Sequence, residues 1–286
     1  MPDFTQVIAM LEDIRRLAAT AEIDAKLDAV EQELGLLAGD VPPVEPVIPP
    51  SVQIPGFEIY GGVETERFPD CCAIGNDEDY YCTGTLIAPT VVVTARHCDD
   101  GVTRVFLKGN NIAHPAGGET IPVVAEYENP DVDLRVVVLA RPASVPPRHV
   151  AQGDEVYAPQ MVTLAGFGTM DSSGQVGYGV KREVDVPLTS LDCSAPNDFY
   201  NYGGRAGREM VAGQRGLARD SCKGDSGGPL YIQSRNGDDV YLLGATSRGI
   251  RRRLTECGDG GIYVRVDRCL DWIRQVTGVD VEGPLT

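Results

Sequence analysis

Residues 222–230 read Cys-Lys-Gly-Asp-Ser-Gly-Gly-Pro-Leu, and this is the most informative stretch of the chain. It places one serine, Ser226, among glycines and directly after an acid. Such a backbone can turn sharply and aim its N–H groups at a developing oxyanion. The stretch is weak evidence alone, because Gly, Asp and Ser are common in turns. Its meaning therefore depends on what precedes it along the chain.

Two earlier runs supply partners for this serine. Residues 94–98 read Thr-Ala-Arg-His-Cys, and residues 133–139 read Asp-Leu-Arg-Val-Val-Val-Leu. A neutral serine hydroxyl is a poor nucleophile, so it needs a base within hydrogen-bond reach and that base needs an orienting acid. The order His97, Asp133, Ser226 is one of the chain orders in which Ser-His-Asp chemistry recurs. We therefore predict that these three side chains form a catalytic triad.

With these runs in place, the chain resembles a trypsin-like serine protease of the chymotrypsin family over roughly residues 59–277. Further runs that carry the resemblance are Ile59-Tyr60-Gly61-Gly62, Cys82-Thr83-Gly84-Thr85-Leu86-Ile87, Gly261-Ile262-Tyr263-Val264-Arg265-Val266 and Trp272-Ile273. The resemblance implies a mainly β fold, with two packed six-stranded antiparallel β-barrels and a C-terminal helix.

The residue pattern by itself also favours a β fold from Ile59 onward. Short β-rich runs alternate with Gly, Pro, Asn and Asp clusters, which is typical of an all-β sandwich or barrel. These runs are residues 91–95, 104–108, 134–140, 162–166, 182–188, 240–246 and 261–266. The only strong helical stretch in this part of the chain is residues 269–277.

The resemblance also implies roles for residues around Ser226. The backbone N–H groups of Gly224 and Ser226 are expected to form the oxyanion hole, and Asp220 to form the floor of a pocket for Arg or Lys. The other expected substrate-binding residues are Ser221, Ser247, Gly249 and Gly261. The implied activity is hydrolysis of protein or peptide substrates after Arg or Lys, through an acyl-enzyme.

Three positions depart from the family pattern. Arg96 stands where a small residue usually precedes the catalytic histidine, and Arg248 replaces the usual aromatic residue after Ser247. Lys223 lies at the expected rim of the pocket. Cations at positions 248 and 223 are expected to favour acidic substrate residues beside the cleaved one.

Activation is expected to involve Ile59 and Asp225. In the family, cleavage frees an Ile amine that pairs with the acid before the nucleophile. Here Glu58 precedes Ile59, and no Arg or Lys occurs from residue 27 to residue 66. A pocket that selects Arg or Lys would not cut this bond. We therefore expect a zymogen cleaved by a Glu-tolerant protease, or a switch by the N-terminal region without cleavage.

Composition divides the chain into three parts. Residues 1–40 are expected to be a helical N-terminal region, residues 41–58 a Pro-rich linker, and residues 59–286 the protease domain. Apolar residues in the first part recur at three- and four-residue steps, in two sets that fall out of phase at residues 21–23. This pattern indicates either a helical hairpin or one long drifting helix.

Two interpretations of the N-terminal region stay open. It is either a propeptide that aids folding, or a regulatory segment whose helices bind a protein partner. The alternative function for the whole chain is an inactive protease-like binding module, or an adaptor whose N-terminal helices recruit a partner. The complete triad and the intact Gly-Asp-Ser-Gly-Gly run count against an inactive module.

The bulk composition excludes several classes of function. A net charge of −17 argues against non-specific nucleic-acid binding, and the hydrophobic runs are too short for a membrane span. The chain shows no metal-ligand cluster, phosphate loop or dinucleotide fingerprint, so we expect no cofactor and no catalytic metal. A structural Ca²⁺ on an acidic loop stays open.

Eight cysteines give conflicting indications about compartment. The resemblance implies disulfides Cys82–Cys98 and Cys222–Cys257, which favour export. No signal peptide is evident at the N-terminus, which favours retention in the cytoplasm, so the localisation is not assigned. The four other cysteines have no assigned pairing; they are Cys71, Cys72, Cys193 and Cys269.

Overall fold

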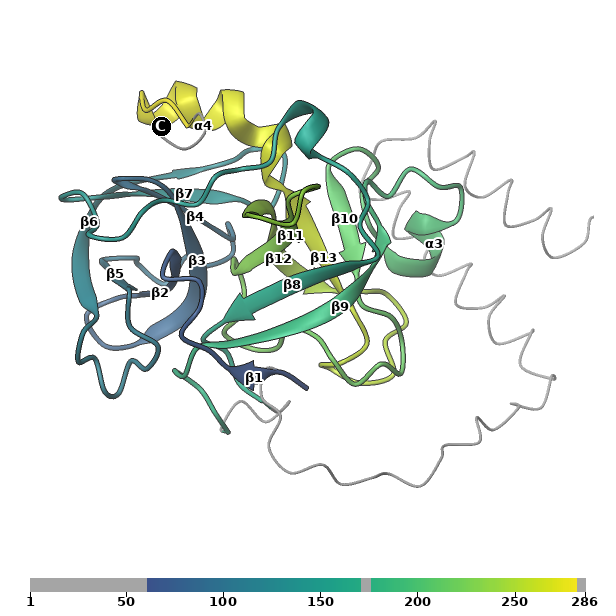
Figure 1. Ribbon diagram of the computed structural model, residues 1–286, viewed down its shortest axis with the longest axis horizontal. Coiled ribbons are helices and arrows are strands. Elements are labelled where there is room, and N and C mark those ends of the chain that lie inside the picture. The colour runs from purple at the N-terminus through teal and green to yellow at the C-terminus, as the bar shows by residue number, and fades with distance from the viewer. Residues whose placement is uncertain (1–60, 171–175, 282–286) are drawn as a thin grey trace, which may run out of the picture. The chain divides into compact units, whose positions relative to one another are not determined.

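The computed structural model describes residues 61–170 and 176–281 (Figure 1). The predicted helical region, the linker and the activation residues Glu58 and Ile59 lie outside the described residues. Within the described residues, no helix combines the length and the apolar character that a membrane span requires.

Six antiparallel strands close the first barrel, drawn in blue and teal in Figure 1. Neighbouring strands follow the order β2-β3-β4-β7-β6-β5, and β5 pairs with β2 to complete the ring. The strands are β2 (Cys71–Gly75), β3 (Tyr80–Ala88), β4 (Val91–Thr94), β5 (Arg104–Leu107), β6 (Glu119–Glu128) and β7 (Arg135–Leu139).

The second barrel, green to yellow in Figure 1, also contains six antiparallel strands. Its ring follows the order β8-β9-β10-β13-β12-β11, and β11 pairs with β8 to close it. The strands are β8 (Met161–Gly166), β9 (Arg182–Ser190), β10 (Glu209–Ala212), β11 (Pro229–Gln233), β12 (Val240–Gly249) and β13 (Gly261–Arg265). A short strand β1 (Val63–Glu64) adds to the outer edge of β9.

The helical elements are short and lie between or after the strands. They are η2 (Gly153–Glu155), α3 (Asp198–Tyr202), η3 (Val266–Cys269) and α4 (Leu270–Thr277). The predicted barrels and C-terminal helix are confirmed, with α4 ending at Gly278, whose φ of 67° is the left-handed conformation that glycine favours. Helix α3 was not predicted, because five residues are too few to show a helical period.

Buried aliphatic side chains fill both barrels and the junction between them. Strands β4 and β7 pair three valines with three valines, in the register Val91–Val138, Val92–Val137 and Val93–Val136. Such β-branched residues pack well on a pleated surface. Helix α4 joins this core through Leu270 and Ile273, which belong to the same buried cluster as Val91 and Val93.

A buried polar cluster connects the two barrels. Asp70, just before β2, accepts hydrogen bonds from the guanidinium of Arg148 at 2.6 and 3.1 Å and from the hydroxyl of Tyr231 on β11 at 2.6 Å. The ring of Tyr231 stacks on Phe68 with centroids 4.3 Å apart. These contacts fix the first barrel against the second, and the candidate site is divided between them.

Candidate active site

His97 lies within hydrogen-bonding distance of both Asp133 and Ser226. His97 Nε2 is 2.8 Å from Ser226 Oγ, and His97 Nδ1 is 2.8 Å from Asp133 Oδ2. The backbone N–H of His97 also donates to Asp133 Oδ1 at 3.1 Å. His97 follows β4 and Asp133 precedes β7, which is paired with β4, whereas Ser226 comes from the second barrel before β11. Packing of the two barrels therefore assembles the three side chains.

The electrostatic environment adapts His97 to act as a base. The hydrogen bond to Asp133 raises the pKa of His97 above its usual value, against the opposing effect of partial burial. Burial opposes ionisation of Asp133, but hydrogen bonds from His97 and Ser247 outweigh it and lower the pKa of Asp133 to about 2. Asp133 is therefore an anion at neutral pH that stabilises the protonated imidazole.

Ser247 makes a contact that the sequence analysis did not anticipate. Its hydroxyl donates to Asp133 Oδ2 at 2.7 Å, although Ser247 was expected only to face the substrate. Strand β12 brings it there from 114 residues away in the sequence. Only the family resemblance singles out this position, because no local pattern around Ser247 indicates a partner.

A threonine from the first barrel holds the loop that carries Ser226. The backbone N–H of Thr83 on β3 donates to the carbonyl of Ser226 at 2.9 Å, and its hydroxyl donates to the carbonyl of Gly224 at 2.8 Å. No described residue accepts a hydrogen bond from the N–H of Gly224 or of Ser226. These two N–H groups are therefore available to a negatively charged oxygen. Thr83 was missed as a site residue, although it lies inside a run that carried the resemblance.

Two glycines are required by the shape of this loop. Gly224 has a φ of 91°, and a Cβ there would lie 2.9 Å from the backbone of Gly168. Gly227 has a φ of 78°, and a Cβ there would lie 2.2 Å from the hydroxyl of Thr94. Any other residue at these positions would be strained and would displace Ser226 from His97.

Asp225 is buried behind the loop. Its carboxylate accepts from the N–H of Gly168 and the N–H of Cys222, each at 2.8 Å. Burial raises the pKa of Asp225 to about 6, despite these two donors. A positive charge brought next to this carboxylate would favour its ionised form.

Asp220 lies in a pocket of about 290 Å³ that extends to Ser226. Its carboxylate is 3% exposed and accepts from the N–H of Gly260 at 3.0 Å and the hydroxyl of Tyr263 at 3.2 Å. Burial raises the pKa of Asp220 to about 7, although these donors favour the anion. A cationic ligand bound in the pocket would therefore lower the pKa of Asp220 and favour its ionised form.

The other expected pocket residues surround Asp220. Ser221, Ser247 and Gly249 line the pocket, and Gly249 pairs with Gly261 across β12 and β13. Gly261 does not line it; its absent side chain leaves room instead for the ring of Tyr263. Lys223 and Arg248 also line the pocket, and sequence reasoning missed two further residues of the rim, which are Arg253 and Glu256.

The structure corrects the expected role of Arg248. Its guanidinium donates to both carboxylate oxygens of Glu209, at 2.8 and 2.9 Å, and Glu209 is 1% exposed. The charge of Arg248, whose side chain is 41% exposed, is therefore paired with a buried carboxylate and is not a free attraction for acidic substrate residues. Lys223 likewise lies 3.3 Å from Glu256 at the rim of the pocket. The guanidinium of Arg96 donates to the carbonyl of Asn129 at 3.1 Å.

Two disulfides hold the segments that carry the site. Cys82–Cys98 joins β3 to the residue after His97, and Cys222–Cys257 joins the Ser226 loop to the far side of the pocket. The four other cysteines are free and buried. In residues 61–170 and 176–281, His, Cys, Asp and Glu side chains form no group arranged to hold a metal ion.

Comparison with known proteins identifies the family. The trypsin family model matches residues 59–273. Brachyurin of Leptuca pugilator is 32% identical over 237 residues, which cover 77% of this chain and 99% of that protein. Trypsin 5G1 of Aedes aegypti is 27% identical over 238 residues, which cover 77% of this chain and 85% of that protein. The CLIP domain-containing serine protease HP8 of Bombyx mori is 29% identical over 256 residues, which cover 75% of this chain and 68% of that protein. The chain belongs to the trypsin family of serine proteases.

Proposed function

We propose that this protein is a serine endopeptidase that cleaves peptide bonds after Arg or Lys. The observation that best supports this proposal is that a single pocket contains both Asp220 and Ser226, with Ser226 Oγ 2.8 Å from His97 Nε2. A long cationic side chain that reaches Asp220 places its own carbonyl carbon beside the serine hydroxyl. The pocket therefore couples recognition of charge to the position of the bond that is cut.

The proposed reaction follows from the hydrogen bonds. Ser226 Oγ attacks the carbonyl while His97 Nε2 takes the hydroxyl proton, and the N–H groups of Gly224 and Ser226 receive the oxyanion. His97 then gives this proton to the departing amine, which leaves an acyl-enzyme. Water, deprotonated by His97, then attacks the acyl carbon. The bond to Ser226 Oγ breaks, His97 returns the proton to Oγ, and the acid product leaves. Asp133 stabilises the imidazolium in both steps.

Activation is proposed to depend on Asp225. Cleavage between Glu58 and Ile59 would free an ammonium group to pair with this buried carboxylate and hold the Ser226 loop in place. The burial of Asp225 and its donors from Gly168 and Cys222 support this role. N-terminal sequencing of active enzyme tests it. An Ile59 terminus produced by the purified enzyme alone would contradict our inference that the enzyme does not activate itself.

A peptide anilide assay tests the activity. We expect hydrolysis of substrates ending in Arg or Lys and little of matched substrates ending in Phe or Glu. Ser226→Ala should lower turnover by about 10⁴-fold or more. If protein with a free Ile59 terminus hydrolyses none of them, the alternative of an inactive binding module or adaptor is favoured.

A further inference from the structure

Three consecutive arginines occupy a loop at the edge of the pocket. Residues 250–256, here called the arginine loop, connect the pocket residue Gly249 to the disulfide-bonded Cys257. The guanidinium of Arg215 donates to the carbonyls of Arg251 and Arg252 at 2.7 and 2.9 Å. These bonds fix the backbone of the loop, so its side chains are presented from a defined position.

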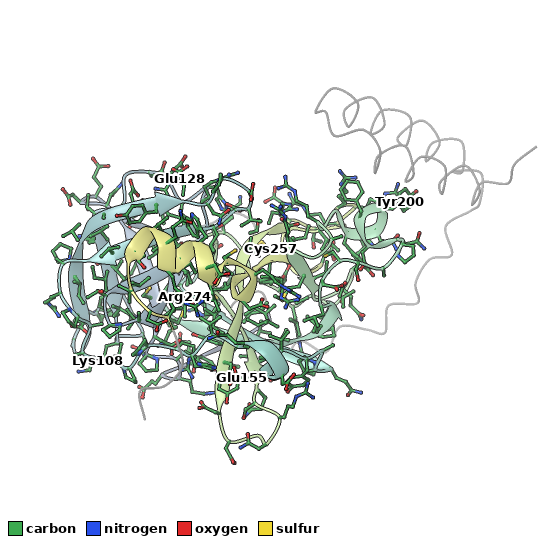
Figure 2. All side chains as sticks on the ribbon, turned by 90° about the horizontal axis from the view of Figure 1, so that it is seen from above. Lys108, Glu128, Glu155, Tyr200, Cys257 and Arg274 are labelled. Carbon is green, nitrogen blue, oxygen red and sulfur yellow. A yellow bond between two sulfur atoms is a disulfide. The ribbon has the colours of Figure 1, made fainter. Side chains whose placement is uncertain are left out.

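Aromatic side chains of α3 support two of these arginines. The guanidinium of Arg251 lies 4.6 Å from the ring centre of Phe199, and that of Arg252 lies 4.1 Å from the ring centre of Tyr200, which is labelled in Figure 2. Stacking orients a guanidinium but leaves its N–H edge able to donate to a carboxylate. Arg252 is exposed, so its edge is accessible from solvent.

The surroundings of the loop are basic in an otherwise acidic protein. Residues 198–219 and 248–256 together contain eight arginines and three acids, whereas the whole chain has a net charge of −17. The three acids are already engaged: Asp198 with Ser190, Glu209 with Arg248, and Glu256 with Lys223. Two further acids next to these segments, Asp220 and Asp259, are each only 3% exposed.

Within the part of the chain that the structure describes, Arg252 and Arg253 therefore lack a counter-charge. Among the described residues, no carboxylate lies within ion-pair distance of either guanidinium, and both side chains are exposed. Leu254, next to them, is 77% exposed. Two unneutralised cations beside an exposed apolar side chain form a surface suited to an acidic peptide that also carries an apolar residue.

The position of Arg253 relates this surface to the substrate. Its Nη1 lies only 2.5 Å from where a Cβ on Gly249 would be, so it borders the mouth of the pocket. The family resemblance implies that the substrate backbone pairs with residues 247–249, so we expect a substrate whose cleaved residue fills the pocket to continue toward its own N-terminus along this segment. An extended chain advances about 3.3 Å per residue, so it reaches the arginine loop three or more residues before the cleaved bond.

We propose that the arginine loop binds acidic residues of the substrate, at the third to sixth positions before the cleaved bond. This inference rests on the proposed function, because it requires the residue before the cleaved bond to fill the pocket beside Ser226. A peptide fits better than a long polyanion such as a sulfated polysaccharide. The basic area is small, the rest of the protein repels polyanions, and Leu254 provides an apolar contact that a sulfated sugar does not use.

The test compares two hexapeptide anilides that end in Gly-Arg and differ only at the fourth and fifth residues before the cleaved bond. One has Glu-Glu and the other Gln-Gln. We expect protein with a free Ile59 terminus to hydrolyse the Glu peptide with a kcat/KM about fivefold higher, and this ratio to fall toward one as NaCl rises from about 50 to 500 mM. In R252E the ratio should fall below one.

A matched control is Arg235, in the turn between β11 and β12. Its guanidinium also stacks on a tyrosine, 4.5 Å from the ring centre of Tyr157, but ten residues of β12 separate this turn from Gly249, a length of about 30 Å. R235E should keep the wild-type ratio. A ratio near one in the wild type, or equal ratios in R252E and R235E, would overturn the proposal.

A binding measurement separates this proposal from the proposed function. If neither peptide is hydrolysed, the proposed function fails, and the loop is tested by anisotropy of a fluorescein-labelled Glu-rich peptide with the Ser226→Ala protein. Weaker binding in R252E/S226A than in R235E/S226A supports the acidic-peptide surface. Absence of binding, or displacement of the peptide by heparin fragments at lower concentration than by unlabelled peptide, overturns it.

Discussion

The hydroxyl of Ser247 donates to Oδ2 of Asp133 at 2.7 Å, and the same oxygen accepts from His97 at 2.8 Å. Asp133 is therefore held from both barrels, since Ser247 belongs to β12 and His97 follows β4. A carboxylate fixed in this way holds the imidazole in one orientation and one tautomer. Ser247 acts through Asp133 and is a positioning residue.

Ser247→Ala should lower kcat by about tenfold, because a hydrogen bond to a charged group is worth about 1.5–3 kcal/mol and only part of this is specific to the transition state. Asp133 would become a stronger acceptor for His97, so the acid limb of the kcat/KM profile should move to higher pH. The control is Ser234→Ala, which removes the hydroxyl of another buried serine, in the turn between β11 and β12. An unchanged kcat and acid limb in Ser247→Ala would assign Ser247 to substrate contact alone.

The pH dependence of activity should report the ionisation of His97. The hydrogen bond to Asp133 raises the pKa of His97 above 6.5, and the base must be neutral to accept the serine proton. Activity should therefore fall as pH decreases through a midpoint above 6.5. Asp133→Asn removes the main cause of the shift, so the midpoint should move to lower pH while kcat falls about 10⁴-fold.

Asp99 provides the control for this profile. It raises the pKa of His97 only through space, as the weakest of the contributions, so Asp99→Asn should lower the midpoint slightly and leave kcat nearly unchanged. Equal shifts in the Asp99 and Asp133 variants would mean that the hydrogen bond is not the main cause.

Features that depend on local sequence were predictable, whereas contacts between residues far apart in the sequence were not. The valine runs of β4 and β7 indicate strands by residue type, and α4 shows a helical stripe with a glycine at its end. The pair Arg248–Glu209 joins residues 39 apart, and neither position has a local pattern that indicates the other. From the sequence we therefore expected an unpaired cation at Arg248, but the fold places the buried carboxylate of Glu209 next to it.

The pocket residues show the same limit. Asp220 was identified by the family resemblance, which relies on its register against Cys222 and Ser226. The crowding of Gly249 by Arg253 depends on the path of the arginine loop, and this path is set by Arg215 and Asp259 from other segments. Loop conformation follows from such long-range bonds, so spacing alone does not reveal it.

Asp220 should make the protein less stable as pH rises. Its pKa is raised to about 7 by burial, compared with about 3.9 in an unfolded chain, so the folded state binds a proton that the unfolded state has lost. The stabilisation is present below pH 4 and is lost as pH increases toward 7. Asn does not ionise, so Asp220→Asn should lack this slope, which amounts to about 2–4 kcal/mol between pH 4 and pH 8.

Unfolding in urea at several pH values measures how the free energy of unfolding depends on pH. Hydrolysis of an Arg anilide measures the contribution of Asp220 to kcat/KM. Asp220→Asn should lower kcat/KM for the Arg substrate by about 10³-fold or more, because the cation loses its anionic partner. Asp185→Asn is the control, since Asp185 is exposed on β9 and bonds Thr163. A slope in Asp220→Asn equal to that of the wild type would place the pKa of Asp220 in its usual range.

The buried cluster of Asp70, Arg148 and Tyr231 should be required for stability and for activity together. Arg148→Met would leave the carboxylate of Asp70, which is 1% exposed, with only the Tyr231 hydroxyl. Removing one partner of a buried ion pair costs about 3–5 kcal/mol. Since the triad is divided between the barrels that this cluster joins, kcat/KM should fall in the same variant, and Asp70→Asn combined with Arg148→Met should recover most of the stability.

The control for this prediction is an exposed ion pair. Arg141, whose side chain is 51% exposed, lies 2.8 Å from Glu119, and Arg141→Met should change the free energy of unfolding by less than about 1 kcal/mol. Urea unfolding of the four proteins gives the comparison. If Arg148→Met is no more destabilising than Arg141→Met, the cluster does not hold the barrels together. If Arg148→Met is destabilised but the double variant regains nothing, the guanidinium contributes through packing on Phe68 and Tyr231, because loss of that packing would persist when the buried charge is removed.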